Sequence, residues 1–138
     1  MKDIALILMS HGNMASEALK SAEMIVGKVN NAYAISMEAD EGMSGISLKL
    51  DAILKETSVF SHTFVIVDLL GGTPCNVALE KLTSLKNVTL ISGLTLAMII
   101  EFAMSQYDDY EKLKEHLIEV GRNGIKDIPA VLSDNLDE

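Results

Sequence analysis

The sequence predicts an open α/β fold, in which a four-stranded parallel sheet carries helices on both faces. Short apolar runs recur along the chain, and longer segments with helical spacing lie between them. Glycine and polar residues follow each apolar run. Strands that are buried on both faces read as continuous apolar runs, and strict alternation of strand and helix is typical of a parallel sheet with crossover helices. These observations predict a doubly wound sheet.

Four apolar segments are the expected strands. They are Ile4–Met9, Ala32–Met37, Phe64–Val67 and Val88–Ile91. Each connection between them is long enough for a helix, so we expect right-handed crossovers. We expect the strand order 2-1-3-4, which would make the first and third strands neighbours at the centre of the sheet.

The segments between the strands have helical spacing. The expected helices are Ala15–Val26, Ser44–Glu56, Cys75–Ser84, Ala97–Ser105 and Tyr110–Val120. Pro74 is placed to be the first-turn proline of the third helix, where its missing N–H group does no harm. In the second helix, we expect Leu48, Ala52 and Leu54 to face the sheet.

The C-terminal segment follows the last of these expected helices. Gly121 stands at a helix end, and a short apolar stretch, Ile125–Leu132, follows it. We interpret this stretch as a fifth strand or a docking arm that could pair with another subunit. The length of 138 residues is that of one domain, which we expect to span residues 1–138.

Composition and charge exclude several classes of protein. The chain is 49% hydrophobic and 22% charged, and its formal net charge of −9 disfavours nucleic acid and anionic membranes as partners but favours basic proteins. The single cysteine, Cys75, cannot form an internal disulfide, and we expect it to pack in the core. No segment has the roughly 20 apolar residues of a membrane-spanning helix, and no secretory signal is recognisable. We therefore expect a cytoplasmic protein.

Polar residues gather after the first and third strands. His11 and Gly12 follow the first strand, and Asp68 follows the third. In an open α/β sheet the functional residues lie beyond the carboxyl ends of the strands. With the order 2-1-3-4, His11 faces Asp68. A carboxylate that accepts the proton of one imidazole nitrogen fixes the tautomer and leaves the other nitrogen as a nucleophile.

A glycine turn completes the candidate site. Gly71, Gly72 and Thr73 lead into the expected helix at Pro74. Free backbone N–H groups, a hydroxyl and the positive end of a helix dipole suit the oxygens of a phosphoryl group. We therefore predict His11, Asp68 and Thr73 as the catalytic residues and Gly12, Gly71 and Gly72 as the phosphate-binding residues.

Other interpretations of the same residues stay open. His11 could be structural, Asp68 could cap a turn, and the glycine pair could be plain turn chemistry. A receiver-like signalling domain would take the phosphoryl group on Asp68 itself, but it needs an acidic pair where this chain has His11. A flavin-binding module of similar topology lacks support because aromatic residues make up only 4% of the chain. His62 precedes the third expected strand, and we expect it to be solvated.

Three spaced motifs carry a family resemblance. The sequences S-H-G-N-M-A, D-L-L-G-G-T-P-C-N and G-L-T-L-A-M, together with the late V-G-R-N-G-I-K, resemble the IIA component of mannose-family sugar phosphotransferase systems (PTS). The resemblance covers nearly the whole chain. It implies that His11 accepts phosphate from the phosphocarrier HPr and passes it to a IIB protein during sugar uptake through a IIC/IID membrane complex, with no metal, nucleotide or other cofactor. It also implies that Asp68 pairs with the histidine and that Thr73 stands where the family commonly has serine.

The resemblance has further implications and some departures. It implies a homodimer in which a fifth, antiparallel C-terminal strand is exchanged. Leu70 replaces a common aromatic residue, and Thr95 and Ala97 replace an asparagine and a proline. These departures lie at the rim of the site, so they concern partner choice. The phosphocarrier subunit of dihydroxyacetone kinases is the alternative within this chemistry, but its turn after the aspartate differs.

Overall fold

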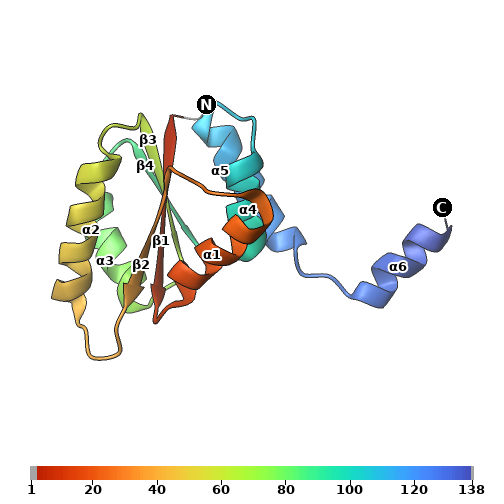
Figure 1. Cartoon of the computed structure of the whole chain (residues 1–138), viewed down its shortest axis with the longest axis horizontal. Helices are drawn as coiled ribbons and strands as arrows, with labels where there is room; N and C mark the ends of the chain where they lie inside the picture. Colours follow the sequence, from red (N-terminus) through yellow and green to blue (C-terminus); the bar gives the residue numbers. More distant parts are fainter. Residues whose placement is uncertain (1–2, 138) are drawn as a thin grey trace.

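The computed structural model describes residues 3–137 and confirms the parallel sheet. The strands are β1 (Ile4–His11), β2 (Ala32–Met37), β3 (His62–Val67) and β4 (Val88–Ser92). All three strand pairs are parallel, and the order is β2-β1-β3-β4, as the sequence predicted. The two central strands, β1 and β3, therefore end side by side at the carboxyl edge of the sheet (Figure 1).

Helices cover both faces of the sheet. They are α1 (Met14–Val26), α2 (Met43–Thr57), α3 (Thr73–Leu82), α4 (Leu96–Met104), α5 (Tyr110–Asn123) and α6 (Ile128–Asp137). Helices α1, α4 and α5 pack on one face, and α2 and α3 pack on the other, whereas α6 projects away from the layers (Figure 1). Within residues 3–137, no helix combines the length and the apolar character needed to cross a bilayer.

The core is divided by the sheet into two clusters. Successive side chains of a strand point to opposite faces, so Leu6 and Leu8 of β1 pack with Phe64 and Phe102 in one cluster. Ile7 and Met9 belong to the other cluster, which includes Ile46 and Leu50 of α2. Each fully buried side chain of this size contributes about 1.5–3 kcal/mol. The ends of β1 and β3 are thus fixed by a core on both sides.

The expected inward face of α2 is confirmed for Leu54 but was wrong for Leu48 and Ala52. Leu48 and Ala52 are exposed, whereas Leu54 is half-buried and packs against the core. The side chains that enter the core are Ile46 and Leu50, which lie one turn apart. A mixed pattern with small and apolar residues on more than one side of the helix left the choice of face open, and packing against the sheet decided it.

The expected C-terminal strand is also absent from this chain, because the segment is helical. Residues 128–137 form α6, and residues 125–127 have no regular structure. Pro129 explains the difference, since proline is well suited to the first turn of a helix but cannot donate a hydrogen bond in a strand. A helix also satisfies its backbone groups internally, whereas a lone strand needs a partner strand.

His62 does not lie in solvent as expected. It is the first residue of β3, and it is only 4% exposed. Its Nε2 lies 2.7 Å from the Thr89 hydroxyl oxygen, and its ring stacks on Tyr110 with 4.0 Å between the ring centroids. The histidine thus anchors the start of α5 to the sheet, at the end opposite to His11.

Candidate active site

His11 is the last residue of β1 and begins a tight turn into α1. Gly12 follows with φ of +55°, a left-handed conformation that favours glycine. The buried Ser10 hydroxyl accepts a hydrogen bond from the Ala15 N–H group at 2.7 Å and donates one to the Gly12 carbonyl at 3.2 Å. The turn therefore presents the His11 side chain at the edge of the sheet, and hydrogen bonds hold Ser10 and Gly12 on either side of it.

Asp68 lies next to His11, as predicted, and makes two contacts with it. It follows β3, and its N–H group donates to the Met9 carbonyl of β1 at 3.0 Å. Its Oδ2 accepts the backbone N–H of His11 at 2.9 Å and lies 2.9 Å from His11 Nδ1. One carboxylate oxygen therefore fixes both the main chain and the ring of His11.

The two side chains differ in exposure. The Asp68 side chain is 10% exposed, whereas that of His11 is 43% exposed. The other carboxylate oxygen, Oδ1, is buried and has no hydrogen-bond partner within residues 3–137. In a neutral imidazole, a buried carboxylate next to Nδ1 favours the tautomer with its proton on that nitrogen, and the lone pair is then on Nε2.

The predicted glycine turn packs directly against the imidazole. Gly71 has φ of +91°, and Gly72 is the N-cap of α3. A Cβ atom on Gly72 would lie 2.5 Å from His11 Cε1 and 3.0 Å from Nε2. Only a residue without a side chain allows this approach, so the start of α3 lies on the side of the ring that carries Nε2.

Thr73 is the first residue of α3 and is half-buried. Its hydroxyl makes no hydrogen bond to any other residue in the described part of the chain. The first backbone N–H groups of a helix have no partner within it and carry the positive end of the helix dipole. Thr73 directly follows Gly72, the residue that packs against the His11 ring.

The rim of the site contains the residues that depart from the family pattern. Thr95 is the N-cap of α4, and its hydroxyl accepts the Met98 N–H group at 3.2 Å. Leu70 is exposed, and Ala97 is half-buried. Thr95 thus has a structural role in starting α4, whereas Leu70 leaves apolar surface next to the glycine turn.

The His11 side chain is 43% exposed, so the site can be reached from solvent. A cavity of about 500 Å³ exists at the opposite edge of the sheet, where Val29, Asn31, Phe60 and Ser105 are among its lining residues. It lies at the amino ends of the strands and does not include His11. Access to His11 from solvent suits a group that reacts with another protein.

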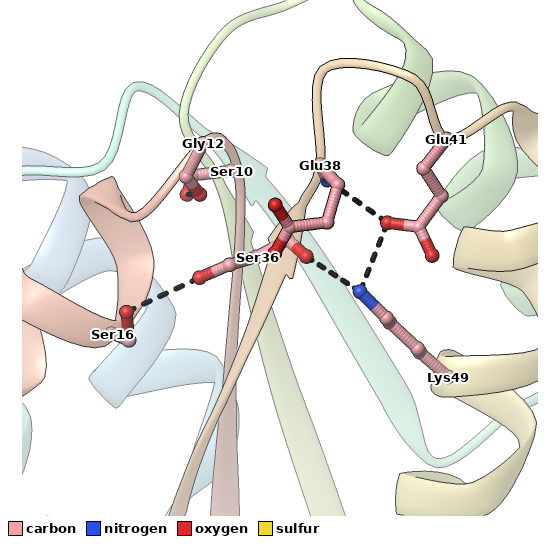
Figure 2. Close-up of polar contacts among 7 residues, drawn as sticks. All are labelled: Ser10, Gly12, Ser16, Ser36, Glu38, Glu41 and Lys49. Carbon is pink, nitrogen blue, oxygen red and sulfur yellow. Dashed lines mark hydrogen bonds and ion pairs between the residues drawn. The ribbon is translucent and has the colours of Figure 1, made fainter.

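Sequence reasoning missed residues that support the His11 turn. Ser16 and Ser36 are joined by a hydrogen bond, and Lys49 of α2 donates to the carbonyl of Ser36 (Figure 2). These side chains come from three different elements and have no motif or spacing in common. Only the positions of α1, β2 and α2 in the fold bring them together.

A comparison with known families assigns the chain. The family model EIIA-man, described as a PTS system fructose IIA component, matches residues 5–119. The chain belongs to the mannose family of PTS IIA domains. This IIA domain is 30% identical over 129 residues to the mannose-specific EIIAB component of Escherichia coli, an alignment that covers 92% of the chain but only 40% of that protein. The sorbose-specific EIIA component of Lacticaseibacillus casei is 28% identical and is matched over 83% of each protein.

Solved structures agree with this assignment. The mannose/sorbose-specific IIA subunit from Enterococcus faecalis is 44% identical, has a TM-score of 0.83 and is aligned over 91% of this IIA domain and 94% of that chain. A phosphotransferase system EIIA component from Streptococcus agalactiae is 28% identical with a TM-score of 0.82, over 92% and 98% of the two chains. The family resemblance found in the sequence is therefore confirmed, and the chain is a PTS component.

Proposed function

We propose that this IIA domain is a phosphoryl carrier that accepts phosphate from HPr on His11 Nε2 and passes it to a IIB protein in the cytoplasm. The observation that supports this proposal best is the contact of His11 Nδ1 with Asp68 Oδ2, at 2.9 Å, in a histidine whose side chain is 43% exposed. Transfer to IIB would serve the uptake and phosphorylation of a sugar through a IIC/IID membrane complex. Family membership supports these partners.

The proposed step is an in-line transfer between two histidines. The lone pair of His11 Nε2 attacks the phosphorus of the donor phosphohistidine, and the donor N–P bond breaks as the new N–P bond forms. The proton stays on Nδ1, where the Asp68 carboxylate balances the positive charge that develops on the ring. The start of α3 and the Thr73 hydroxyl would bind the phosphoryl oxygens. Since the incoming bond is already activated, positioning supplies most of the catalysis.

Asp68 is less well placed to accept the phosphoryl group itself. Its Oδ2 is already bonded to His11, and its Oδ1 is buried. The two linkages differ in chemistry, because phosphohistidine survives alkali and is lost in acid, whereas an acyl phosphate is lost in both. The stability of the labelled protein therefore distinguishes a IIA carrier from a receiver-like domain.

The test is a phosphorylation assay with HPr and its upstream kinase, read by mass spectrometry of the modified peptide. We expect one alkali-stable phosphoryl group on His11 and no labelling of His11→Ala. His116→Ala is the matched control and should be phosphorylated as wild type is. His116 of α5 contacts Glu101 of α4, not the residues at the strand ends. Labelling that survives in His11→Ala would overturn the assignment of His11.

A homodimer is the second part of the proposal. The family resemblance implies exchange of a C-terminal segment between two copies. The apolar side chains of Ile125 and Ile128 are exposed in the single chain, which is consistent with a segment that is covered by a partner.

A further inference from the structure

The turn that carries His11 is attached to the end of β2. The Gly12 N–H group donates to the Met37 carbonyl at 2.8 Å. The Ser36 hydroxyl lies 3.2 Å from the Ser16 hydroxyl, and the Ser16 hydroxyl donates to the Asn13 carbonyl at 3.1 Å. The last two residues of β2 therefore brace both residues that follow His11.

The end of β2 is held in turn by Lys49. β2 is an edge strand, so it has a neighbouring strand on one side only. The Ser36 carbonyl accepts a hydrogen bond from Lys49 Nζ at 2.9 Å, in place of a strand partner. Figure 2 shows Lys49 reaching from α2 toward the end of β2, on the opposite side of the strand from Ser16.

Glu41 fixes the ammonium group of Lys49. Its Oε1 lies 2.9 Å from Lys49 Nζ and also accepts the Glu38 N–H group at 2.9 Å (Figure 2). The backbone N–H group of Glu38, and then Lys49, hold the pKa of Glu41 below its ordinary value of 4.5, so the carboxylate is charged at neutral pH. The Glu41 side chain is 15% exposed, whereas that of Lys49 is 41% exposed.

An ion pair this exposed contributes little to the free energy of unfolding. Its effect is on geometry, because one ammonium group links Glu41 of the β2–α2 loop to the Ser36 carbonyl of β2. Lys49 donates to the Ser36 carbonyl, and the Ser36 hydroxyl is linked through the Ser16 hydroxyl to the Asn13 carbonyl in the His11 turn. No hydrogen bond or ion pair joins Lys49 to His11 or Asp68 directly within residues 3–137.

We propose that Lys49 is a positioning residue for phosphoryl transfer at His11. It acts through the end of β2, which sets the Gly12–Asn13 turn and with it the angle of the imidazole against the start of α3. The inference rests on the proposed function of His11 as the phosphoryl acceptor. It requires that loss of Lys49 lower the rate of the transfer step while the donor protein still binds.

The first test measures phosphorylation of Lys49→Met by HPr. We expect kcat to fall roughly tenfold, while KM stays within about twofold of the wild-type value. This fall in kcat is smaller than the about 10²-fold loss that a 1 Å misplacement can cause. Lys49→Arg should recover most of the rate, since a guanidinium group can donate to both Ser36 and Glu41. The matched control is Lys81→Met, which removes an ion pair of 2.9 Å between α3 and Asp51 of α2 and should leave kcat unchanged.

The second test does not depend on phosphorylation. Hydrogen exchange of the Gly12 amide, followed by NMR, should become roughly tenfold faster in Lys49→Met and stay as in wild type in Lys81→Met. Glu41→Gln keeps an acceptor for the Glu38 N–H group but loses the charge, so it should show a smaller increase of the same kind. If Lys49→Met folds poorly, Glu41→Gln tests the same link in its place.

Three outcomes would contradict the inference in distinguishable ways. Unchanged kcat and unchanged Gly12 exchange in Lys49→Met would show that Lys49 has no influence on the turn. A higher KM with an unchanged kcat would make Lys49 a contact for the donor protein, not a positioning residue. If wild type took no phosphoryl group on His11, the proposed function would fail, and Gly12 exchange would still measure the structural link by itself.

Discussion

Asp68 combines two tasks in a single oxygen atom. Its Oδ2 accepts the main-chain N–H of His11 and faces Nδ1 of the same residue, each at 2.9 Å. The main-chain contact fixes where the side chain begins, and the ring contact fixes its tautomer. Since Asp68 is held by the Met9 carbonyl through its own N–H group, the pair is anchored to the centre of the sheet.

Asp68→Asn should slow phosphorylation of His11 without unfolding the chain. An amide oxygen can still accept the His11 N–H group, but the negative charge beside Nδ1 is lost. We expect a rate about 10²-fold lower in a rapid-quench assay with HPr, which is within the range for loss of one charge-stabilising group. Asp51→Asn removes one charge from an exposed ion pair and is the control. Equal rates for the two variants would exclude Asp68 from the mechanism.

The burial of His62 gives the chain a pH-dependent stability. Burial lowers the pKa of His62 below its ordinary value of 6.5, and Glu111 opposes this shift. The unfolded chain therefore binds a proton that the folded chain does not, and the free energy of unfolding should fall as pH drops below about 6.5, until the folded pKa is reached. Urea denaturation between about pH 8 and about pH 5 measures this slope.

His62→Gln is the variant that isolates the effect. Glutamine can keep a hydrogen bond to Thr89 but does not titrate, so the free energy of unfolding should depend less on pH in this window. A slope equal to that of wild type would mean that other groups cause the pH dependence.

Residue positions were predictable where topology determines them. His11 and Asp68 each follow an apolar run, and parallel central strands must end at the same edge, so their proximity could be inferred from sequence. The second contact of Asp68, to the main chain of His11, could not be, because it depends on the shape of the turn at Gly12. The same holds for Ser36 and Lys49, whose bond depends on how α2 crosses the edge strand.

At the scale of elements, the start of α3 lies against His11. Gly72 packs against the imidazole, and the N–H groups of Thr73 and Cys75 follow it, since Pro74 has none. The N-cap of α3 is Gly72, which has no side chain to bond to the first N–H groups of the helix. The start of α3 therefore remains available to an anion, whereas the start of α4 is occupied by the Thr95 hydroxyl.

Gly72→Ala should impair phosphorylation while the fold is kept. The φ of Gly72 is −83°, which alanine adopts freely, but the added Cβ would lie 2.5 Å from His11 Cε1 and would displace the ring. A displacement of this kind should lower the rate at least about tenfold, since transfer depends on alignment. Gly42→Ala is the matched control, because Gly42 is the N-cap of α2 with open space around its Cα. Similar rates in both variants would contradict the role of this contact.

The strands were the elements predicted best, because each contains a continuous apolar run. β2 was predicted at its observed bounds, and β1 and β4 at their observed starts, whereas β3 begins two residues earlier than expected, at His62. The face of α2 and the form of residues 125–132 could not be predicted in the same way. In α2, several faces carry apolar side chains, so the sequence does not show which face is buried. In the C-terminal segment, the apolar residues led to the prediction of a strand, although Pro129 favours the start of a helix.

At the scale of the whole molecule, the exposed edge that carries His11 and the acidic net charge both suit a protein that binds other proteins. His11 lies outside the large cavity, at an edge where Leu69, Leu70 and Leu96 are exposed. Apolar residues around a reactive group, on a chain with a formal net charge of −9, suit a basic partner with an apolar contact surface. The sequence alone indicated the charge, but the position of these leucines needed the fold.

The proposed homodimer can be tested at the C-terminal segment, which projects from the layers (Figure 1). Ile125 is 86% exposed and Ile128 is 67% exposed in the single chain, so Ile125→Asp and Ile128→Asp should change the stability of a monomer by less than about 0.5 kcal/mol. In a dimer that covers this segment, each substitution would bury an unpaired carboxylate.

We therefore expect wild type to sediment as a dimer and both variants to sediment mainly as monomers, with His11 still phosphorylated by HPr. Val59→Asp is the control, because Val59 is 79% exposed in the turn before β3, and it should remain dimeric. Sedimentation equilibrium over a wide range of protein concentrations measures the difference. A wild type that is monomeric throughout, or variants that dimerise as tightly as Val59→Asp, would show that this segment does not hold two copies together.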